Sequence, residues 1–164
     1  MAYTFTFSGT QFFIATSTIV STTPLTMAAW FNAATLTAGR TLCCIEDSLA
    51  QNGWRLLVQT NGSIRLAVRS SNVVTGVADT TATVTTGTWN HACATTTGTT
   101  NRVVYLNGAN AVTSTTSATA PVSVARTNIG AAGGGGSAMD GAIAEVGIWS
   151  AALSAEEVAA LGAG

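Results

Sequence analysis

The chain has 164 residues, a length that predicts a single domain able to bury a core without disulfides or metals. Charged residues are only 8% of the chain, the formal net charge is −1, and threonine and alanine are far more frequent than in an ordinary domain. No basic field is available to attract a polyanion, so these values exclude nucleic acid as an expected partner.

The first residues lack the basic and apolar regions of a secretory signal, and no apolar run is long enough to span a membrane. We therefore expect synthesis in the cytoplasm without a signal peptide, and no membrane partner. The three cysteines, Cys43, Cys44 and Cys93, are a poor disulfide framework because their number is odd and two are adjacent. We expect them to be small buried hydrophobic side chains.

The beginning of the chain predicts β-strands. Tyr3, Phe5 and Phe7 alternate with threonine, which is the period of a half-buried strand. Residues 25–31 are apolar on both faces, as expected for a strand that is buried between two layers.

Residues 54–69 predict a β-hairpin whose register follows from its apolar pattern. A two-residue turn would mix the two faces of this hairpin. A three-residue loop over 60–62 instead pairs Trp54 with Val68 and keeps one face apolar, so we favour it. In this register three arginines project from the other face, where a solvated surface or a subunit contact is the simplest interpretation: Arg55, Arg65 and Arg69.

The second half of the chain continues with strands. Residues 89–93 and 102–106 predict two more strands, and the glycine-rich residues 128–141 predict a flexible loop. Residues 142–149 then predict the last strand.

Only the end of the chain has a helical pattern. Ser154 precedes Glu157 by three positions, which is the spacing of a capping box, and Gly162 is a helix stop. We expect a helix at about 154–161. No repeat or linker divides the chain, so the prediction is one all-β domain over residues 1–164 with one short C-terminal helix.

Six motifs follow one another along the chain: FSGTQFF, LTMAAWF, GTWNHACA, VVYLNG, NIGA and MDGAIAEVGIWSAALSAEEVAAL. In this order and spacing they resemble the laminin-G-like, concanavalin A-like lectin and glucanase superfamily over essentially the whole chain. The resemblance implies a jelly-roll sandwich of two antiparallel sheets in which the first and last strands are adjacent. It also implies a structural role for His91 in the Trp-x-His element.

One departure from the family pattern concerns acidic residues. Ala144 stands in the last strand where members of the family commonly have aspartate. Some members bind calcium through carboxylates in loops, and the sequence has no such cluster. We therefore expect no cofactor and no metal, with calcium as the ion that remains open.

The aromatic residues and the single histidine predict a structural core. We expect six large side chains to pack there: Trp30, Trp54, Trp89, His91, Tyr105 and Trp149. The alternative is a catalytic pair of His91 and Cys93. These two residues share a strand face at a spacing of about 7 Å, which is too long for a hydrogen bond.

Glycoside hydrolases of the same fold need two carboxylates on one strand face. Glu46 and Asp47 are adjacent and would point to opposite faces, and Asp140 and Glu145 have an odd spacing. We therefore predict no catalytic residue, and a glycoside hydrolase is the third interpretation of function.

Polar residues between the expected strands are the candidates for a ligand-binding rim: Asn52, Asn72, Asp79, Asn128 and Asp140. Trp54 and Trp149 offer faces on which a sugar ring can stack, although packing in the core is the first interpretation of both.

Two functions from different classes remain. In the first, the chain is a non-catalytic structural protein on the surface of a virus particle, such as a phage capsid decoration or a tail-fibre component. Its partners would be copies of itself or a capsid or tail protein, since a surface with few charges loses little solvation when it is buried. In the second, it is a lectin-like module that binds surface glycans. The two are compatible.

Overall fold

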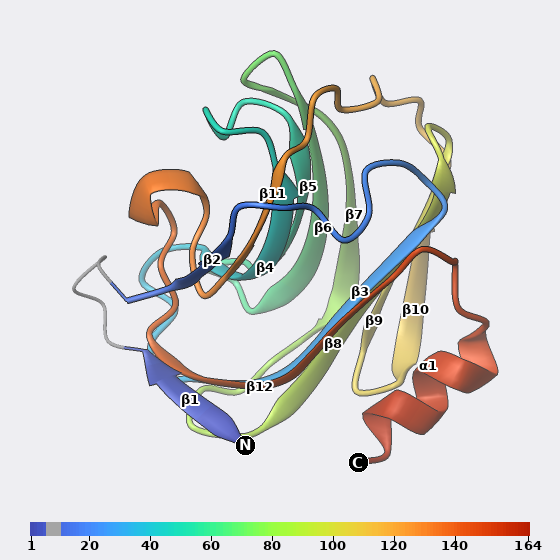
Figure 1. Cartoon of the computed structure of the whole chain (residues 1–164). Coiled ribbons are helices and arrows are strands. Elements are labelled where there is room, and N and C mark those ends of the chain that lie inside the picture. The colour runs from blue at the N-terminus through green and yellow to red at the C-terminus, as the bar shows by residue number, and fades with distance from the viewer. Residues whose placement is uncertain (6–10) are drawn as a thin grey trace.

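The computed structural model of the chain, which describes residues 1–5 and 11–164, contains two six-stranded antiparallel sheets that lie face to face (Figure 1). This confirms the predicted all-β jelly-roll sandwich. The first sheet has the strand order β1 (Ala2–Phe5), β12 (Gly141–Trp149), β3 (Leu25–Ala33), β8 (Asn90–Gly98), β9 (Asn101–Leu106) and β10 (Ala109–Ser114).

The second sheet has the order β2 (Phe13–Ala15), β11 (Arg126–Ile129), β4 (Arg40–Glu46), β5 (Gly53–Val58), β6 (Ser63–Ser70) and β7 (Val73–Thr83). The expected adjacency of the first and last strands is confirmed in the first sheet, where β1 pairs with β12. Phe7, which was expected to continue the first strand, lies outside the described residues.

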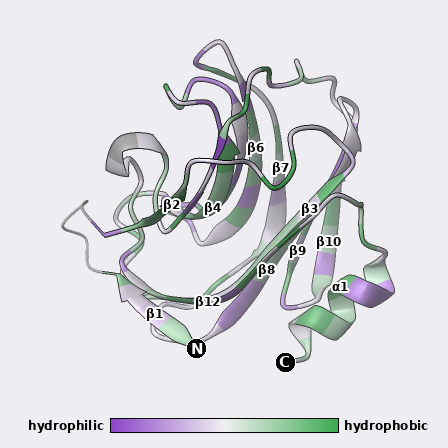
Figure 2. Cartoon of the chain, in the orientation of Figure 1, coloured by the Kyte–Doolittle hydropathy of each residue, from purple (hydrophilic) through white to green (hydrophobic). Residues whose placement is uncertain are grey.

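The main core lies between the two sheets because alternate residues of each strand point inward. Leu25, Phe31, Ile45 and Leu66 are completely buried there. Hydrophobic and hydrophilic residues alternate along β6 (Figure 2), which is the pattern of a strand with one face in the core. β3 is buried on both faces, as predicted.

The predicted hairpin register is confirmed. Trp54 pairs with Val68 across β5 and β6, and the amide of Gly62 donates to the carbonyl of Gln59 over 3.0 Å. Gly62 has a φ of 85°, a conformation that favours glycine. The outer face of this hairpin therefore carries the arginines of β5 and β6.

The predicted helix is α1 (Ala155–Gly162), and its capping box between Ser154 and Glu157 is present. The helix runs one residue further than expected, because Gly162 is its last residue. Val158 packs against Ala28 and Cys93 on the outer face of the first sheet. None of the helices in the described part of the chain has the length and apolar character needed to cross a membrane.

Two expectations about local structure are wrong. Trp89 precedes β8 and its side chain is 45% exposed, so it does not lie in the core. The range 128–141 is not one loop, because Asn128 belongs to β11 and Gly133–Gly135 forms a short 3-10 helix, η1. Strand pairing with β2 and β4, which the sequence does not display, extends β11 into this range.

The other predicted core residues lie either between the two sheets or on the outer face of the first sheet. Trp54 is buried between the sheets. His91 and Tyr105 are buried on the outer face of the first sheet, and Tyr105 belongs to the small cluster beneath α1. Trp30 and Trp149 lie on the same outer face and are half-buried.

Candidate binding site on the outer face of the second sheet

The central strands of the second sheet bring polar side chains together on its outer face. Because neighbours on a strand point to opposite faces, β4 places Cys43 and Ile45 in the core and Glu46 outside. Across the sheet, Arg126 of β11 is paired with Glu46. On the other neighbouring strand, β5, Gly53 is the register partner of Glu46, and Arg55 lies two residues further along, diagonally opposite Glu46. We call the cluster of Glu46, Arg55, Arg69, Arg126 and Asn128 the arginine face.

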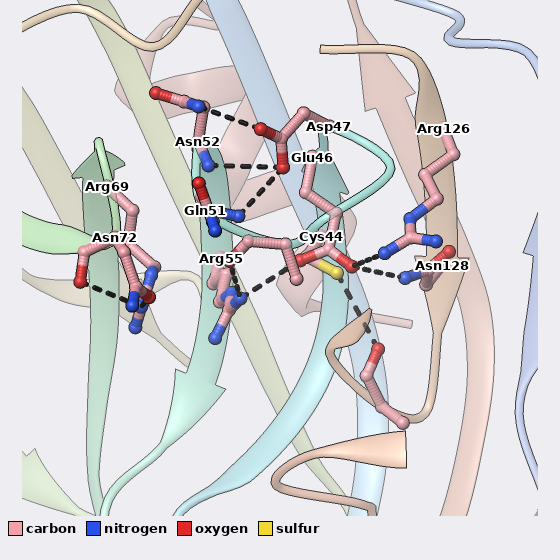
Figure 3. Close-up of polar contacts among 12 residues, drawn as sticks. Cys44, Glu46, Asp47, Gln51, Asn52, Arg55, Arg69, Asn72, Arg126 and Asn128 are labelled. Atoms are coloured by element: carbon pink, nitrogen blue, oxygen red, sulfur yellow. Dashed lines mark hydrogen bonds and ion pairs between the residues drawn. The ribbon is translucent and has the colours of Figure 1, made fainter. Parts of the chain in front are cut away.

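Glu46 is the centre of the arginine face (Figure 3). Its Oε2 accepts a hydrogen bond from Arg55 Nη2 over 3.1 Å, and its Oε1 accepts one from Asn128 Nδ2 over 2.6 Å. Arg126 Nη2 lies 3.5 Å from Oε1. The carboxylate is therefore shared between two guanidinium groups and one amide, all supplied by different strands from its own.

Several buried polar atoms of the arginine face make no hydrogen bond with any residue of 1–5 or 11–164. They include the Nε atoms of Arg55, Arg69 and Arg126 and the Oδ1 atom of Asn128. Buried polar groups are normally satisfied by protein or by ordered water. Because these atoms are themselves buried, a molecule on the sheet would meet only the partly exposed remainder of the arginine side chains.

The charge of the arginine face is unbalanced. On the neighbouring strand β6, Arg69 is the register partner of Gly53. Arg69 therefore lies diagonally opposite Arg55, two residues after Gly53 on β5. Burial lowers the pKa of Arg69 and the positive charge of Arg55 lowers it further, while Glu46 acts in the opposite direction. Three guanidinium groups thus surround a single buried carboxylate, and the face attracts anions.

A loop beside the arginine face is ordered by Asp47. Its Oδ1 accepts from the amide of Gln51 over 2.7 Å, and its Oδ2 accepts from Asn52 Nδ2 over 2.8 Å. Burial raises the pKa of Asp47, but the hydrogen bonds from Asn52 and from backbone amides outweigh it, so the pKa is lowered. Both carboxylate oxygens of Asp47 are therefore hydrogen-bonded within the loop.

Asn52 and Asn72, two of the predicted rim residues, come together next to Arg69 (Figure 3). Asn52 Oδ1 accepts from the amide of Ser71 over 2.9 Å, and the amide of Asn72 donates to the carbonyl of Gln51 over 2.9 Å. Asn72 Oδ1 then accepts from Arg69 Nη2 over 2.6 Å. These contacts order the loops on one side of the arginine face.

The other three predicted rim residues are not on this rim. Asn128 lies within β11 and is fully buried, so it is a buried part of the arginine face and not a loop residue. Asp79 lies within β7, where it forms two hydrogen bonds of 2.6 Å to Arg65. Asp140 accepts from Thr35 Oγ1 over 2.7 Å and lies 3.9 Å from Arg40, at the opposite end of β4. The expectation of a single rim is therefore wrong.

Glu46, Arg55, Arg69 and Arg126 were not among the predicted ligand-binding residues. The alternation of arginines on the 54–69 hairpin was the available signal, since it placed Arg55 and Arg69 on one face. The partners on β4 and β11 are brought to this face by pairing between distant strands: Asn128 is 82 residues from Glu46. No local pattern in the sequence indicates that pairing.

The segment around η1 covers one side of the arginine face. Cys44 Sγ lies 3.6 Å from the carbonyl of Ala131, and a Cβ atom at Gly133 would lie 2.9 Å from Glu46 Oε1 and 2.6 Å from Arg126 Nη2. Only glycine permits this approach. The segment explains why Cys44 and Glu46 are fully buried although they project from the outer face of the sheet.

The acidic residues considered for hydrolysis occupy different places. Glu46 is enclosed by arginines, Asp47 orders a loop, Asp140 lies beside Arg40, and Glu145 lies on the first sheet. Across residues 1–5 and 11–164, no three His, Cys, Asp or Glu side chains are grouped so that they could hold a metal ion. That the chain needs no cofactor, calcium included, stays a prediction.

Comparisons with known proteins agree with this fold. Residues 7–159 match the family model described as the concanavalin A-like lectin/glucanases superfamily. No curated protein sequence matches the chain significantly. Many solved structures are similar, and three of them illustrate the range of proteins that share this fold.

One similar structure is a carbohydrate-binding module, CBM40, of a Ruminococcus gnavus IT-sialidase bound to α2,3-sialyllactose. It is 15% identical, with 87% of this chain and 84% of that chain covered and a TM-score of 0.75. A heptameric SAP-like pentraxin from Limulus polyphemus is 18% identical, with 92% and 75% covered and a TM-score of 0.71. A mutant NanB sialidase from Streptococcus pneumoniae is 16% identical, with 96% and 27% covered and a TM-score of 0.79. At these identities the likeness concerns the fold.

Proposed function

The chain belongs to the concanavalin A-like lectin/glucanase superfamily, and from this premise we propose that it is a non-catalytic module that binds a glycan on the arginine face. The observation that carries the proposal is the unbalanced charge there. Arg55, Arg69 and Arg126 are partly exposed and lie around one buried carboxylate, that of Glu46. A sugar supplies hydroxyl groups that accept hydrogen bonds from guanidinium donors.

The charge of the site favours an acidic sugar. Arginine binds carboxylates through paired N–H donors. Arg55 and Arg126 share the carboxylate of Glu46, and Arg69 is hydrogen-bonded to the neutral side chain of Asn72. A carboxylate on the ligand would balance the remaining charge. The similar R. gnavus module, which was solved with α2,3-sialyllactose, supports this class of ligand. We propose that binding needs no metal ion.

The experiment that tests the proposal is a calorimetric titration of the chain with α2,3-sialyllactose, and with lactose as the neutral control. We expect saturable binding of sialyllactose, weaker binding of lactose, and the same affinity with and without EDTA. Arg69→Gln and Arg126→Gln should each weaken binding about tenfold or more, which is the usual range for a lost charge-assisted hydrogen bond.

Arg65→Gln is the matched control for these variants. Arg65 projects from the same face of β6 as Arg69 but lies four residues away, about 13 Å along the strand, and it is paired with Asp79. Its loss should leave the affinity unchanged. The proposal is overturned if acidic sugars do not bind, or if Arg65→Gln weakens binding as much as Arg69→Gln does.

A second candidate function, a subunit contact on the surface of a particle, is favoured by an apolar edge of the sandwich. β1 and β2 are edge strands of the two sheets, and their side chains Tyr3, Phe13 and Ile14 are about half exposed. The ring centroids of Tyr3 and Phe13 are 4.8 Å apart, and both residues line a hollow of about 330 Å³. Exposed apolar patches on edge strands commonly form protein contacts.

The location of such a contact on a virus particle remains a prediction. Sedimentation velocity at low and high salt tests the contact itself. A contact made through apolar side chains should give oligomers that persist in high salt, and Phe13→Asp should dissociate them. A chain that sediments as a monomer at high concentration in both conditions would remove this candidate.

A further inference from the structure

A concave site lies on the outer face of the first sheet, on the other side of the sandwich from the arginine face. It is a cleft of about 230 Å³ beside α1, and we call it the indole cleft. Its walls are formed by the side chains of β3, β8, β12 and α1. Its principal residues are Ala28, Trp30, His91, Glu145, Trp149 and Leu161.

The backbone of β12 forms this cleft. The register between β12 and β3 shifts between Ala144 and Gly147, and Glu145 in the shifted segment has a φ of 51°. Beyond the shift, the ring of Trp149 folds back over Gly147, where a Cβ atom would lie 2.6 Å from Cζ3 of that ring. The bulge and the glycine therefore fix the place of one indole wall.

The opposite wall is also fixed before any ligand binds. Trp30 Nε1 donates a hydrogen bond to the carbonyl of Leu161 over 3.3 Å, which ties this indole to the end of α1. The ring centroids of Trp30 and His91 are 5.4 Å apart. Preformed aromatic walls reduce the entropy that a ligand loses on binding.

His91 supplies a buried polar atom with unused capacity. Its side chain lines the cleft, the residue is only 2% exposed, and its Nδ1 has no hydrogen-bond partner among the residues that the structure describes. Burial lowers the pKa of His91, against the opposing effect of Glu145, so the imidazole is neutral at pH 7. A neutral imidazole has one nitrogen that accepts a hydrogen bond.

The charge of the cleft is negative. Glu145 lines it and is exposed to solvent, and the described residues of its lining include no arginine. The carboxylate of Glu145 attracts cations through its charge. The faces of the two tryptophan rings attract cations as well. An adjoining hollow of about 390 Å³, which Glu145 and Trp89 line, extends the cleft outward.

We propose that the indole cleft binds a primary ammonium group that is carried on an apolar or sugar body. The ammonium lies between the indole rings and next to the carboxylate of Glu145, and it donates a hydrogen bond to His91. A neutral ligand would use the rings alone, and an anionic ligand would meet the charge of Glu145. The site is independent of the glycan site on the arginine face.

The test is a titration of the ¹⁵N-labelled chain followed by the indole N–H resonances of Trp30 and Trp149. Benzylamine and glucosamine are the two ammonium probes, and benzyl alcohol and glucose are their neutral counterparts. We expect both amines to shift these two resonances saturably and to bind at least about fivefold more tightly than the neutral molecules. Shifts by glucosamine alone would restrict the site to amino sugars, and shifts by benzylamine alone would restrict it to amines with an apolar body.

Glu145→Gln separates this proposal from simple stacking. It keeps the shape of the side chain and removes its charge, so we expect amine binding to weaken about three- to tenfold and binding of the neutral molecules to stay unchanged. Glu156→Gln, on the exposed first turn of α1, is the control and should leave both unchanged.

Unchanged indole resonances in the free Glu145→Gln variant establish that the cleft keeps its structure. The proposal is overturned if neutral and ammonium probes bind equally, if Glu145→Gln binds amines as tightly as the unaltered chain, or if no probe shifts these resonances. Failure of the sialyllactose experiment would leave this result intact, because Arg69→Gln does not touch the cleft.

Discussion

Asn128 Nδ2 donates to Glu46 Oε1 over 2.6 Å, and neither residue is exposed to solvent, although both project from the outer face of a sheet. The segment that crosses them around η1 removes them from water. A carboxylate in such a place is stable only while its hydrogen-bond donors and its arginine partners remain. The arginine face is therefore a part of the folded structure as well as the proposed ligand surface.

Replacement of Asn128 tests this dependence. Asn128→Ala leaves Glu46 Oε1 without its shortest hydrogen bond, so we expect a loss of about 1–3 kcal/mol in the free energy of unfolding. Urea denaturation measures the loss. Thr81→Ala, at an exposed position of β7, is the control and should change stability by less than about 0.5 kcal/mol. Equal stability of the two variants would show that the buried contact contributes nothing.

The approach of Gly133 to the arginine face gives a second prediction. A side chain at this position would meet Ala50, Arg126 and Glu46. Gly133→Ala should therefore destabilise the fold by about 1–3 kcal/mol, as expected for overpacking, and should weaken sialyllactose binding by displacing Arg126.

Gly136→Ala is the matched control for that variant. Gly136 is exposed, its φ is −66°, and the nearest atom to an added Cβ is 3.7 Å away. Alanine should be tolerated there without a change in stability or binding. Thermal unfolding of the two variants, followed by calorimetry, distinguishes a close approach from a general need for glycine in this segment.

The elements that the sequence predicts correctly are those with a local pattern. The alternation in residues 54–69 was sufficient to predict the register of β5 and β6, and the spacing of Ser154 and Glu157 was sufficient for the cap of α1. The core position predicted for Trp89 is wrong, because the alternation of β8 was extended to Trp89, which precedes the first residue of the strand. The charge network of Glu46 was inaccessible, since pairing across the sheet joins β4 to β11 from far along the chain.

The cysteines give a prediction about chemical reactivity. All three are free and buried, and burial raises the pKa values of Cys43 and Cys93 to about 12. Since the thiolate is the reactive form, none of the three should react with iodoacetamide in the native chain at pH 8. In urea all three should be alkylated. Mass spectrometry counts the added groups, and rapid labelling of Cys44 in the native state would contradict the cover that the η1 segment provides.

His91 and Asp47 predict how stability changes with pH. The folded state lowers the pKa of His91 below its ordinary value of 6.5, mainly through burial, so the unfolded chain takes up this proton first as the pH falls. The stability that the neutral His91 contributes is then fully present above pH 6.5, and it decreases as the pH falls below this value.

Asp47 also has a lowered pKa, beneath its ordinary value of 3.8, because its hydrogen bonds outweigh the opposing effect of burial. Its contribution to stability should be lost in a second, more acidic step.

The urea concentration at the midpoint of unfolding, measured between pH 8 and pH 3, should therefore fall in two stages. His91→Gln should abolish the first stage and preserve the second. A single acid step in the unaltered chain, or a first stage that survives His91→Gln, would show that another group is responsible.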